Sequence, residues 1–173
     1  MIINNYLVQI DKRIKDISQD SDFHKMLSNI LRVYYLGIEH ILSVKIINEQ
    51  KENLSISETD IEHLDNSGWI LPEPDNLWIS DEYMPQLKLN FLLSLYTLMN
   101  ITGLDNFEKK FRKNFTKLSE VMLSNGLAKK DTNFNILGND YNLNVGDRIK
   151  ISDEDILSIT DNMLEAFRPN IIN

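Results

Sequence analysis

Side chains that commonly perform chemistry are sparse in this sequence. It has no cysteine and three histidines, His24, His40 and His63. His24 and His40 fall on one predicted helix, about 24 Å apart along its axis, so they cannot share a metal ion. His63 lies near Asp60 and Glu62, a loosely ligand-like group that an ordinary surface histidine explains better. We expect no metal site and no cofactor.

One polar stretch begins like a calcium-binding loop but lacks the rest of that motif. Residues 131–135 read Asp-Thr-Asn-Phe-Asn, but Ile136 and Asn142 stand where an EF-hand needs Gly and Glu. We interpret the stretch as a polar turn. The sequence also has no glycine-rich phosphate loop and no G-x-S-x-G motif. It therefore predicts a protein that is not an enzyme, although a site built from dispersed carboxylates would leave no local motif.

Charge is distributed unevenly along the 173 residues, whose net charge is −8. Residues 52–87 hold nine acidic side chains and no Lys or Arg, so this stretch alone carries −9. The stretches 1–51, 88–130 and 131–173 carry +1, +5 and −5. The electrostatic field of this negative charge repels nucleic acid and anionic membranes and attracts basic partners. We expect a basic protein partner, no nucleic acid and no membrane.

An acidic insertion at about 52–84 contains both tryptophans together with prolines at positions 72 and 74. Long connections between helices are often functional. Trp and Tyr anchor many interfaces, and carboxylates steer basic partners. Alternatively, the insertion has no partner: both tryptophans pack against the bundle and hold the insertion in place, and the acidic side chains face water. The residues predicted to bind a partner are Asp65, Trp69, Glu73, Asp75, Trp78, Asp81, Glu82 and Tyr83.

A run of basic residues between Lys109 and Lys117 could contact phosphates. These residues alternate with an apolar stripe that includes Phe107, Phe111 and Phe115, as in an amphipathic helix. Because the overall charge opposes nucleic acid, we interpret the basic side as a solvated face or one directed at the chain's own acidic segment.

The elements that must position these groups are mainly helices, because apolar residues recur every three or four positions. Helices are expected at about 5–17, 22–50, 57–64, 85–101, 105–125 and after Ser152. The helices at 22–50 and 85–101 are apolar on most sides, which is typical of the centre of a bundle. Gly37 indicates a close helix contact or a slight kink.

Helix ends and one hairpin have their own signals. Residues 20–22 and 152–155 supply N-cap chemistry, residues 105–108 resemble a capping box, and Asn125-Gly126 marks a helix end. Alternation of Tyr141, Leu143 and Val145 before Gly146 predicts a hairpin. The predicted fold is a single mostly α domain over 1–173: a bundle of five or six helices with a small β-hairpin near 140–151.

These features favour a cytoplasmic, non-catalytic protein-binding inhibitor. The absence of cysteine fits a reducing compartment, no leader pattern is found, and the densest apolar run, 91–99, is too short to span a membrane. The specific hypothesis is a bacterial immunity protein or antitoxin that neutralises a basic nuclease-type toxin. The alternative is a self-associating helical module, since the helices at 22–50 and 85–101 have surplus apolar surface. An enzyme ranks third.

Overall fold

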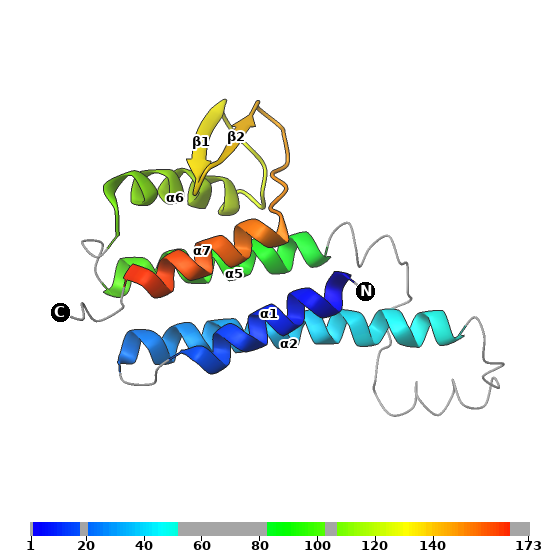
Figure 1. Cartoon of the computed structure of the whole chain (residues 1–173). Helices are drawn as coiled ribbons and strands as arrows, with labels where there is room; N and C mark the ends of the chain where they lie inside the picture. Colours follow the sequence, from blue (N-terminus) through cyan, green and yellow to red (C-terminus); the bar gives the residue numbers. More distant parts are fainter. Residues whose placement is uncertain (1, 18–20, 52–82, 103–106, 167–173) are drawn as a thin grey trace.

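The computed structural model describes residues 2–17, 21–51, 83–102 and 107–166 (Figure 1). Within these ranges the chain forms five helices and one antiparallel hairpin. The prediction of a mostly α bundle with a small hairpin is confirmed. The elements are α1 (Ile2–Asp16), α2 (Asp22–Lys51), α5 (Met84–Thr102), α6 (Lys109–Met122), β1 (Thr132–Ile136), β2 (Asn139–Leu143) and α7 (Asp153–Ala166).

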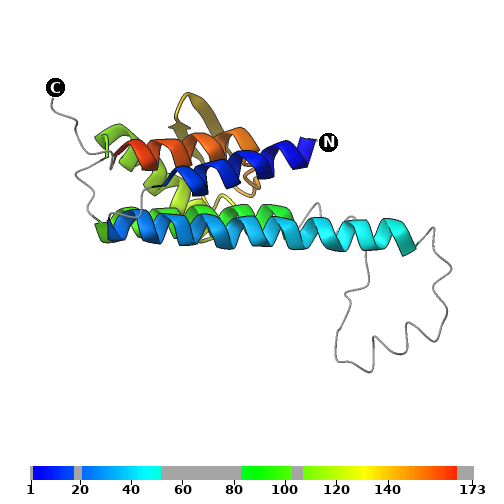
Figure 2. The same ribbon diagram turned by 60° about the horizontal axis from the view of Figure 1, so that its bottom comes forward.

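The helices form two layers. Helices α2 and α5 run antiparallel in one layer, and α1 and α7 lie over them in the second (Figure 2). Helix α6 packs beside α5 and supports the hairpin (Figure 1). A salt bridge between the Arg13 and Asp161 side chains, with an N–O distance of 2.6 Å, joins α1 to α7. The fold therefore brings the first and last described helices together.

Most helix ends follow the predicted signals. The Ser21 Oγ accepts a hydrogen bond of 3.2 Å from the backbone N–H of His24, which caps α2. Helix α6 ends at Met122, and the turn that follows it contains Asn125 and Gly126 at positive φ angles of 55° and 78°. The predicted start of α6 is wrong, because the helix begins at Lys109 with Glu108, not Asp105, at its N-cap.

The core consists of the apolar stripes that the sequence predicts. The ring of Tyr34 on α2 stacks on that of Phe91 on α5, with centroids 4.2 Å apart. A Cβ added at Gly37 would lie 2.8 Å from Leu87 Cδ1, so the predicted close helix contact is confirmed. Fully buried side chains include Leu27, Leu31, Ile38, Leu92, Leu95, Met99, Phe115, Leu118 and Met163.

The expectation that α2 and α5 are both central holds for α5, which packs against α2, α6 and α7, but is wrong for α2, whose outer side is exposed. Because they form an outer layer, one face of each helix is left without a covering helix (Figure 2). Val33 and Leu36 on α2 are 69% and 60% exposed, and Ile101 on α5 is 65% exposed. Met26, which belongs to the predicted core stripe, is 39% exposed. The surplus apolar surface of α2 therefore faces outward, whereas the outward side of α5 is mostly polar apart from Ile101.

The hairpin lies earlier in the chain than expected. Strand β2 contains Tyr141 and Leu143 as predicted, but its partner is β1, which pairs Phe134 with Tyr141, and not the segment around residue 149. The stretch 131–135, interpreted as a polar turn, is mostly β1, with Thr132 and Phe134 buried. The turn is formed by residues 137 and 138, whose φ angles of 50° and 102° suit the twist of a tight hairpin.

Candidate functional site

Most of the predicted partner-binding residues lie outside the described part of the chain. These are Asp65, Trp69, Glu73, Asp75, Trp78, Asp81 and Glu82. The eighth, Tyr83, directly precedes α5 and is 39% exposed. The short helix expected at 57–64 also lies outside the described residues.

The described residues contain a surface site that the sequence did not reveal, a groove along the outer face of α2 and α5. Two adjoining hollows of about 450 and 260 Å³ follow the line between the helices. Both hollows are lined by Ile30 of α2 and by Asn90 and Ser94 of α5, so these residues mark the middle of the groove. The other lining residues are Met26, Asn29, Val33, Tyr34, Leu87, Phe91, Leu93, Thr97, Leu98 and Ile101.

Three polar side chains in this groove, Asn90, Ser94 and Thr97, have partners within their own helix. Ser94 Oγ donates to the Asn90 carbonyl and Thr97 Oγ1 to the Leu93 carbonyl, each at 2.9 Å. Asn90 Oδ1 accepts a bond of 3.1 Å from Gln86 Nε2. Because these bonds do not depend on water, covering the groove would leave both hydroxyl groups with an acceptor. The described lining residues include no charged side chain.

Exposed apolar side chains lie at the edges of these hollows. Val33 and Ile101 are more than half exposed, and Met26 is partly exposed. On a helix these residues share faces with Ile30 and Thr97, at spacings of three or four positions. The groove therefore combines exposed apolar side chains with hollows whose described lining residues are uncharged, although exposed Arg32 lies next to Val33 in α2.

A second cavity, of about 480 Å³, lies between the start of α5 and residues 148–151. It is lined by Lys88, Arg148 and Lys150 together with apolar side chains. The Lys88 Nζ already lies 2.7 Å from an Asp153 carboxylate oxygen and donates to the Ile151 carbonyl at 2.9 Å. This lysine therefore connects α5 to both α7 and the segment that precedes it.

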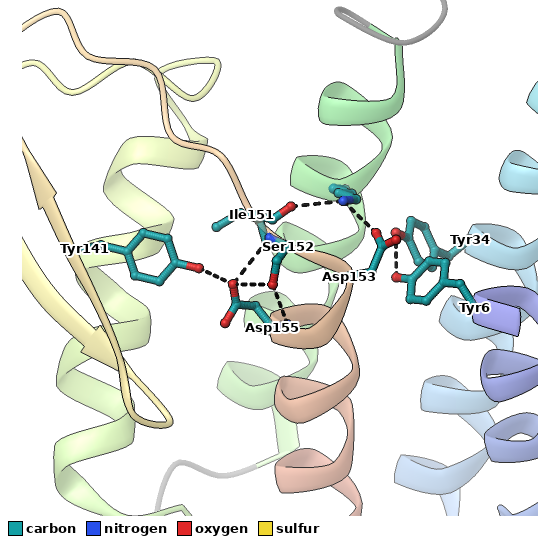
Figure 3. Close-up of polar contacts among 8 residues, drawn as sticks. Tyr6, Tyr34, Tyr141, Ile151, Ser152, Asp153 and Asp155 are labelled. Atoms are coloured by element: carbon teal, nitrogen blue, oxygen red, sulfur yellow. Dashed lines mark hydrogen bonds and ion pairs between the residues drawn. The ribbon is translucent and has the colours of Figure 1, made fainter. Parts of the chain in front are cut away.

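A buried carboxylate joins the hairpin to the start of α7. Asp155 is 5% exposed and accepts hydrogen bonds from Tyr141 Oη at 2.5 Å and from Ser152 Oγ at 2.8 Å (Figure 3). It also accepts a hydrogen bond from Asn139 Nδ2. The Ser152 Oγ in turn accepts from the Asp155 backbone N–H at 3.0 Å, which confirms the predicted cap. With its oxygens occupied by structural donors, Asp155 holds α7 and the hairpin together.

The pKa of the Asp155 carboxyl reflects these contacts. Burial alone would raise its pKa, but the hydrogen bonds from Tyr141, Ser152 and Asn139 outweigh burial and lower it. The pKa of the Tyr141 phenol is raised by burial and by its bond to the carboxylate. Asp155 is therefore ionised at neutral pH and Tyr141 is protonated, which is the combination that the hydrogen bond requires.

Two tyrosines form a second buried polar contact. The hydroxyl groups of Tyr6 and Tyr34 are 3.0 Å apart, on the other side of α7's first turn from Asp155 (Figure 3). Burial raises the pKa of both phenols, and the nearby negative charge of Asp153 raises each further. Both tyrosines therefore remain neutral near pH 7 and serve the contact between α1 and α2.

Other candidate residues take structural roles or stay at the surface. The Lys117 Nζ, from the basic run on α6, donates to the Asn133 carbonyl at 2.7 Å and so supports the hairpin. His24 Nδ1 contacts the capping Ser21 Oγ at 2.8 Å, His40 is exposed, and His63 lies outside the described residues. Within the described ranges, no three His, Asp or Glu side chains are grouped as metal ligands would be.

Comparisons of the chain with protein-family models, with curated proteins and with solved structures give no match. The helices that the structure describes include none with the length and apolar character needed to cross a membrane.

Proposed function

We propose that this protein is a non-catalytic inhibitor that binds a basic partner protein in the cytoplasm. Its specific form would be a bacterial immunity protein or antitoxin directed at a nuclease-type toxin. The observation that carries the proposal is the charge pattern: residues 52–87 hold nine acids and no Lys or Arg, within a chain of net charge −8. A nuclease cleft is built to hold phosphates, so a surface rich in carboxylates complements it.

The scaffold suits this role because both flanks of the acidic segment are held by the bundle. Helix α2 ends at Lys51 and α5 begins at Met84, and the two helices pack antiparallel. The segment is therefore joined at both ends to one packed helix pair. Its last residue before the helix, Tyr83, combines a partly exposed ring with the acids that precede it in sequence.

The test compares two sets of four substitutions that remove the same charge. The partner is first captured from the producing cell by cross-linking and purified. Its affinity for the chain is then measured at several salt concentrations. The test variant is Glu73→Gln/Asp75→Asn/Asp81→Asn/Glu82→Gln. The control variant is Asp22→Asn/Glu120→Gln/Glu154→Gln/Glu165→Gln, which changes exposed acids in the described helices.

We expect the test variant to bind about 10- to 100-fold more weakly, with a smaller salt dependence, because steering charges raise the association rate. The control should bind nearly as well as the unaltered protein. Equal affinities and equal salt dependence of the two variants would overturn the role of the acidic segment. A captured partner with a net negative charge would overturn the proposal as a whole.

A further inference from the structure

The cavity between the start of α5 and residues 148–151 is basic, although the chain as a whole is acidic. Its volume is about 480 Å³, and its charged lining residues are Lys88, Arg148 and Lys150. The other described lining residues are all apolar, so no Asp or Glu is among them, whereas the whole chain has a net charge of −8. We propose that this cavity binds a small phosphate monoester whose organic part is apolar.

Two of the three basic side chains have no counter-ion in the described part of the chain. Arg148 and Lys150 are exposed, and neither forms an ion pair or a side-chain hydrogen bond with a described residue. Lys88, by contrast, is neutralised by Asp153, with an Nζ–Oδ1 distance of 2.7 Å. The cavity therefore has two positive charges in excess. A phosphate monoester carries about −1.5 to −2 at pH 7, so it matches this excess better than a singly charged carboxylate or phosphodiester.

The backbone around Arg148 is held by the segment that follows α6. Leu127 and Arg148 form an antiparallel bridge, and the Ile149 N–H donates to the Gly126 carbonyl at 2.8 Å. The Cγ of Arg148 lies 3.9 Å from the position that a Cβ on Gly126 would take, so the aliphatic stem runs close to this glycine. A guanidinium presents two parallel N–H groups to phosphate oxygens. We therefore assign the main phosphate contact to Arg148.

Lys88 adds a largely buried donor at the wall of the cavity. Its side chain is 16% exposed, and its Nζ contacts the Asp153 carboxylate and donates to the Ile151 carbonyl at 2.9 Å. An ammonium group has three N–H donors, so one remains after these two contacts. Because the two contacts hold Nζ in place, binding a phosphate oxygen costs little further side-chain entropy. Lys88 therefore contributes a hydrogen bond, while Arg148 and Lys150 contribute the charge.

Apolar side chains form the rest of the wall and favour an ester over inorganic phosphate. Leu89, Ile149 and Ile151 line the cavity and are only 6%, 3% and 9% exposed. Met84 and Pro85 line it from the first turn of α5. Pockets for small molecules have volumes of about 300–1,000 Å³ and combine mostly apolar walls with a few polar groups. An apolar group on the phosphate would remove these walls from water, which free phosphate cannot do.

Titration of the full chain with phenyl phosphate, followed by NMR, tests the proposal. The amide signals of residues 86–89 and 148–151 should shift together and saturate, with a dissociation constant on the order of 0.1–1 mM for so small a probe. Signals of β1 and β2, whose residues do not line the cavity, should stay in place. Saturable shifts confined to other residues, or no shifts up to about 10 mM phenyl phosphate, would overturn the proposal.

Removal of the same charge at the cavity and elsewhere gives a matched comparison. The test variant is Arg148→Ala/Lys150→Ala, and the control is Lys109→Ala/Lys113→Ala on α6. Both variants should fold, because all four side chains are exposed. The test variant should bind phenyl phosphate at least about 10-fold more weakly, since hydrogen bonds between charged groups are lost. The control should bind within about twofold of the unaltered chain. Equal weakening in both variants would overturn the proposal.

Three further probes test the chemistry of the ligand. Inorganic phosphate lacks the apolar group, and benzoate has a single negative charge, so each should bind at least about 10-fold more weakly than phenyl phosphate. Equal binding of either probe would overturn the proposed ligand class. Vesicles of phosphatidylcholine and phosphatidic acid present a phosphate monoester at a membrane surface. Sedimentation of the chain with these vesicles, and not with phosphatidylcholine alone, would overturn the assignment to a small molecule.

The acids of the chain itself are the internal alternative to an external phosphate. Asp81 and Glu82 precede α5 in the sequence. The variant Asp81→Asn/Glu82→Gln should bind phenyl phosphate about as well as the unaltered chain. Binding that appears only in this variant would mean that the chain's own carboxylates occupy the cavity, and would overturn the proposal. A basic partner is recognised by acids, whereas this cavity is basic, so failure of either proposal leaves the other intact.

Discussion

The hydroxyl groups of Tyr6 and Tyr34 lie 3.0 Å apart inside the bundle, and both side chains are at least 96% buried. Their rings meet edge to face, with centroids 6.5 Å apart, and the Tyr34 ring also stacks on Phe91. This chain of contacts runs from α1 through α2 to α5. It therefore crosses both layers of the fold with one polar contact and one apolar contact.

Removing either hydroxyl of this pair should destabilise the fold. Tyr6→Phe leaves the Tyr34 hydroxyl buried without its partner, which costs about 1–3 kcal/mol in the free energy of unfolding. The double variant Tyr6→Phe/Tyr34→Phe should lose less than the sum of the two single variants, since neither hydroxyl is then left alone. Urea unfolding of all four proteins measures this coupling. Additive losses would show that the two groups do not interact.

High pH should lower the free energy of unfolding, because the buried phenols of Tyr6 and Tyr34 ionise more easily in the unfolded chain. Burial raises the pKa of Tyr6 and Tyr34 above the ordinary value of 10.0, to which they return in the unfolded chain. Their contribution to stability is therefore complete below pH 10 and decreases as the pH rises above it. Unfolding free energies between about pH 8 and pH 12 should decline less steeply in Tyr6→Phe/Tyr34→Phe. Equal slopes would contradict this assignment.

Loss of the Asp155 carboxylate should detach the hairpin from α7. Asp155→Ala removes the acceptor of Tyr141, Asn139 and Ser152, so we expect a loss of about 3 kcal/mol in the free energy of unfolding. Hydrogen exchange should show faster opening of β1 and β2 than in the unaltered protein. Glu154→Gln, an exposed acid in the same helical turn, should change stability by less than about 1 kcal/mol.

The contribution of the Asp155 carboxylate to stability should also appear in the dependence of the unfolding free energy on acidic pH. The folded state lowers the pKa of Asp155 below its ordinary value of 3.8, so its contribution to stability is complete above that value. This contribution is lost as the pH falls from 3.8 through the lower pKa of the folded state. In Asp155→Ala the free energy of unfolding should fall less steeply over that acidic range. An unchanged acid profile would contradict the proposed bonding.

The effect of Gly37→Ala on the stability of the protein should depend on the side chain at position 87. Gly37→Ala places a Cβ 2.8 Å from Leu87 Cδ1, which must rotate away. Alanine favours the helix by about 1 kcal/mol over glycine, so the two effects should nearly cancel. In a Leu87→Ala background the same change should stabilise the protein by about 1 kcal/mol. Thermal unfolding at low protein concentration measures the change in stability caused by Gly37→Ala in each background. Equal changes with leucine and with alanine at position 87 would disprove the contact.

Much of the helical fold follows from local signals in the sequence. Spacing of apolar residues predicts all five described helices, because one face of each must be buried. Ser21 and Ser152 cap α2 and α7 as expected, since a serine hydroxyl there satisfies a free backbone N–H. The start of α6 differs from the prediction because Asp105 has the residue type of a cap, whereas the helix begins only at Lys109.

The hairpin shows where local signals fail. Its turn places Leu137 at a φ of 50°, a conformation that leucine rarely adopts, so nothing at this position predicts a turn. The asparagines of β1 also obscure its alternation, although Phe134 and Ile136 are buried. Pairing with β2, and not local preference, determines this strand.

The candidate groove could not be predicted for a different reason. A helix such as α2, apolar on several sides, does not itself indicate which side its neighbours will cover. Met26 belongs to the predicted core stripe, yet the arrangement in layers leaves it 39% exposed. The acidic segment was recognised from composition alone, whereas the groove depends on how α2 and α5 lie relative to α1 and α7.

The polar contacts of α7 have a consequence for the order of folding during synthesis. Its Asp153, Asp155 and Asp161 contact Lys88 of α5, Tyr141 of β2 and Arg13 of α1, respectively. The ribosome makes α7 after every other described element, so these contacts can form only once the rest of the bundle has emerged. Until then the side of α5 that packs against α7 lacks its cover. A nascent chain halted before α7 should therefore bind chaperones that recognise exposed apolar surface.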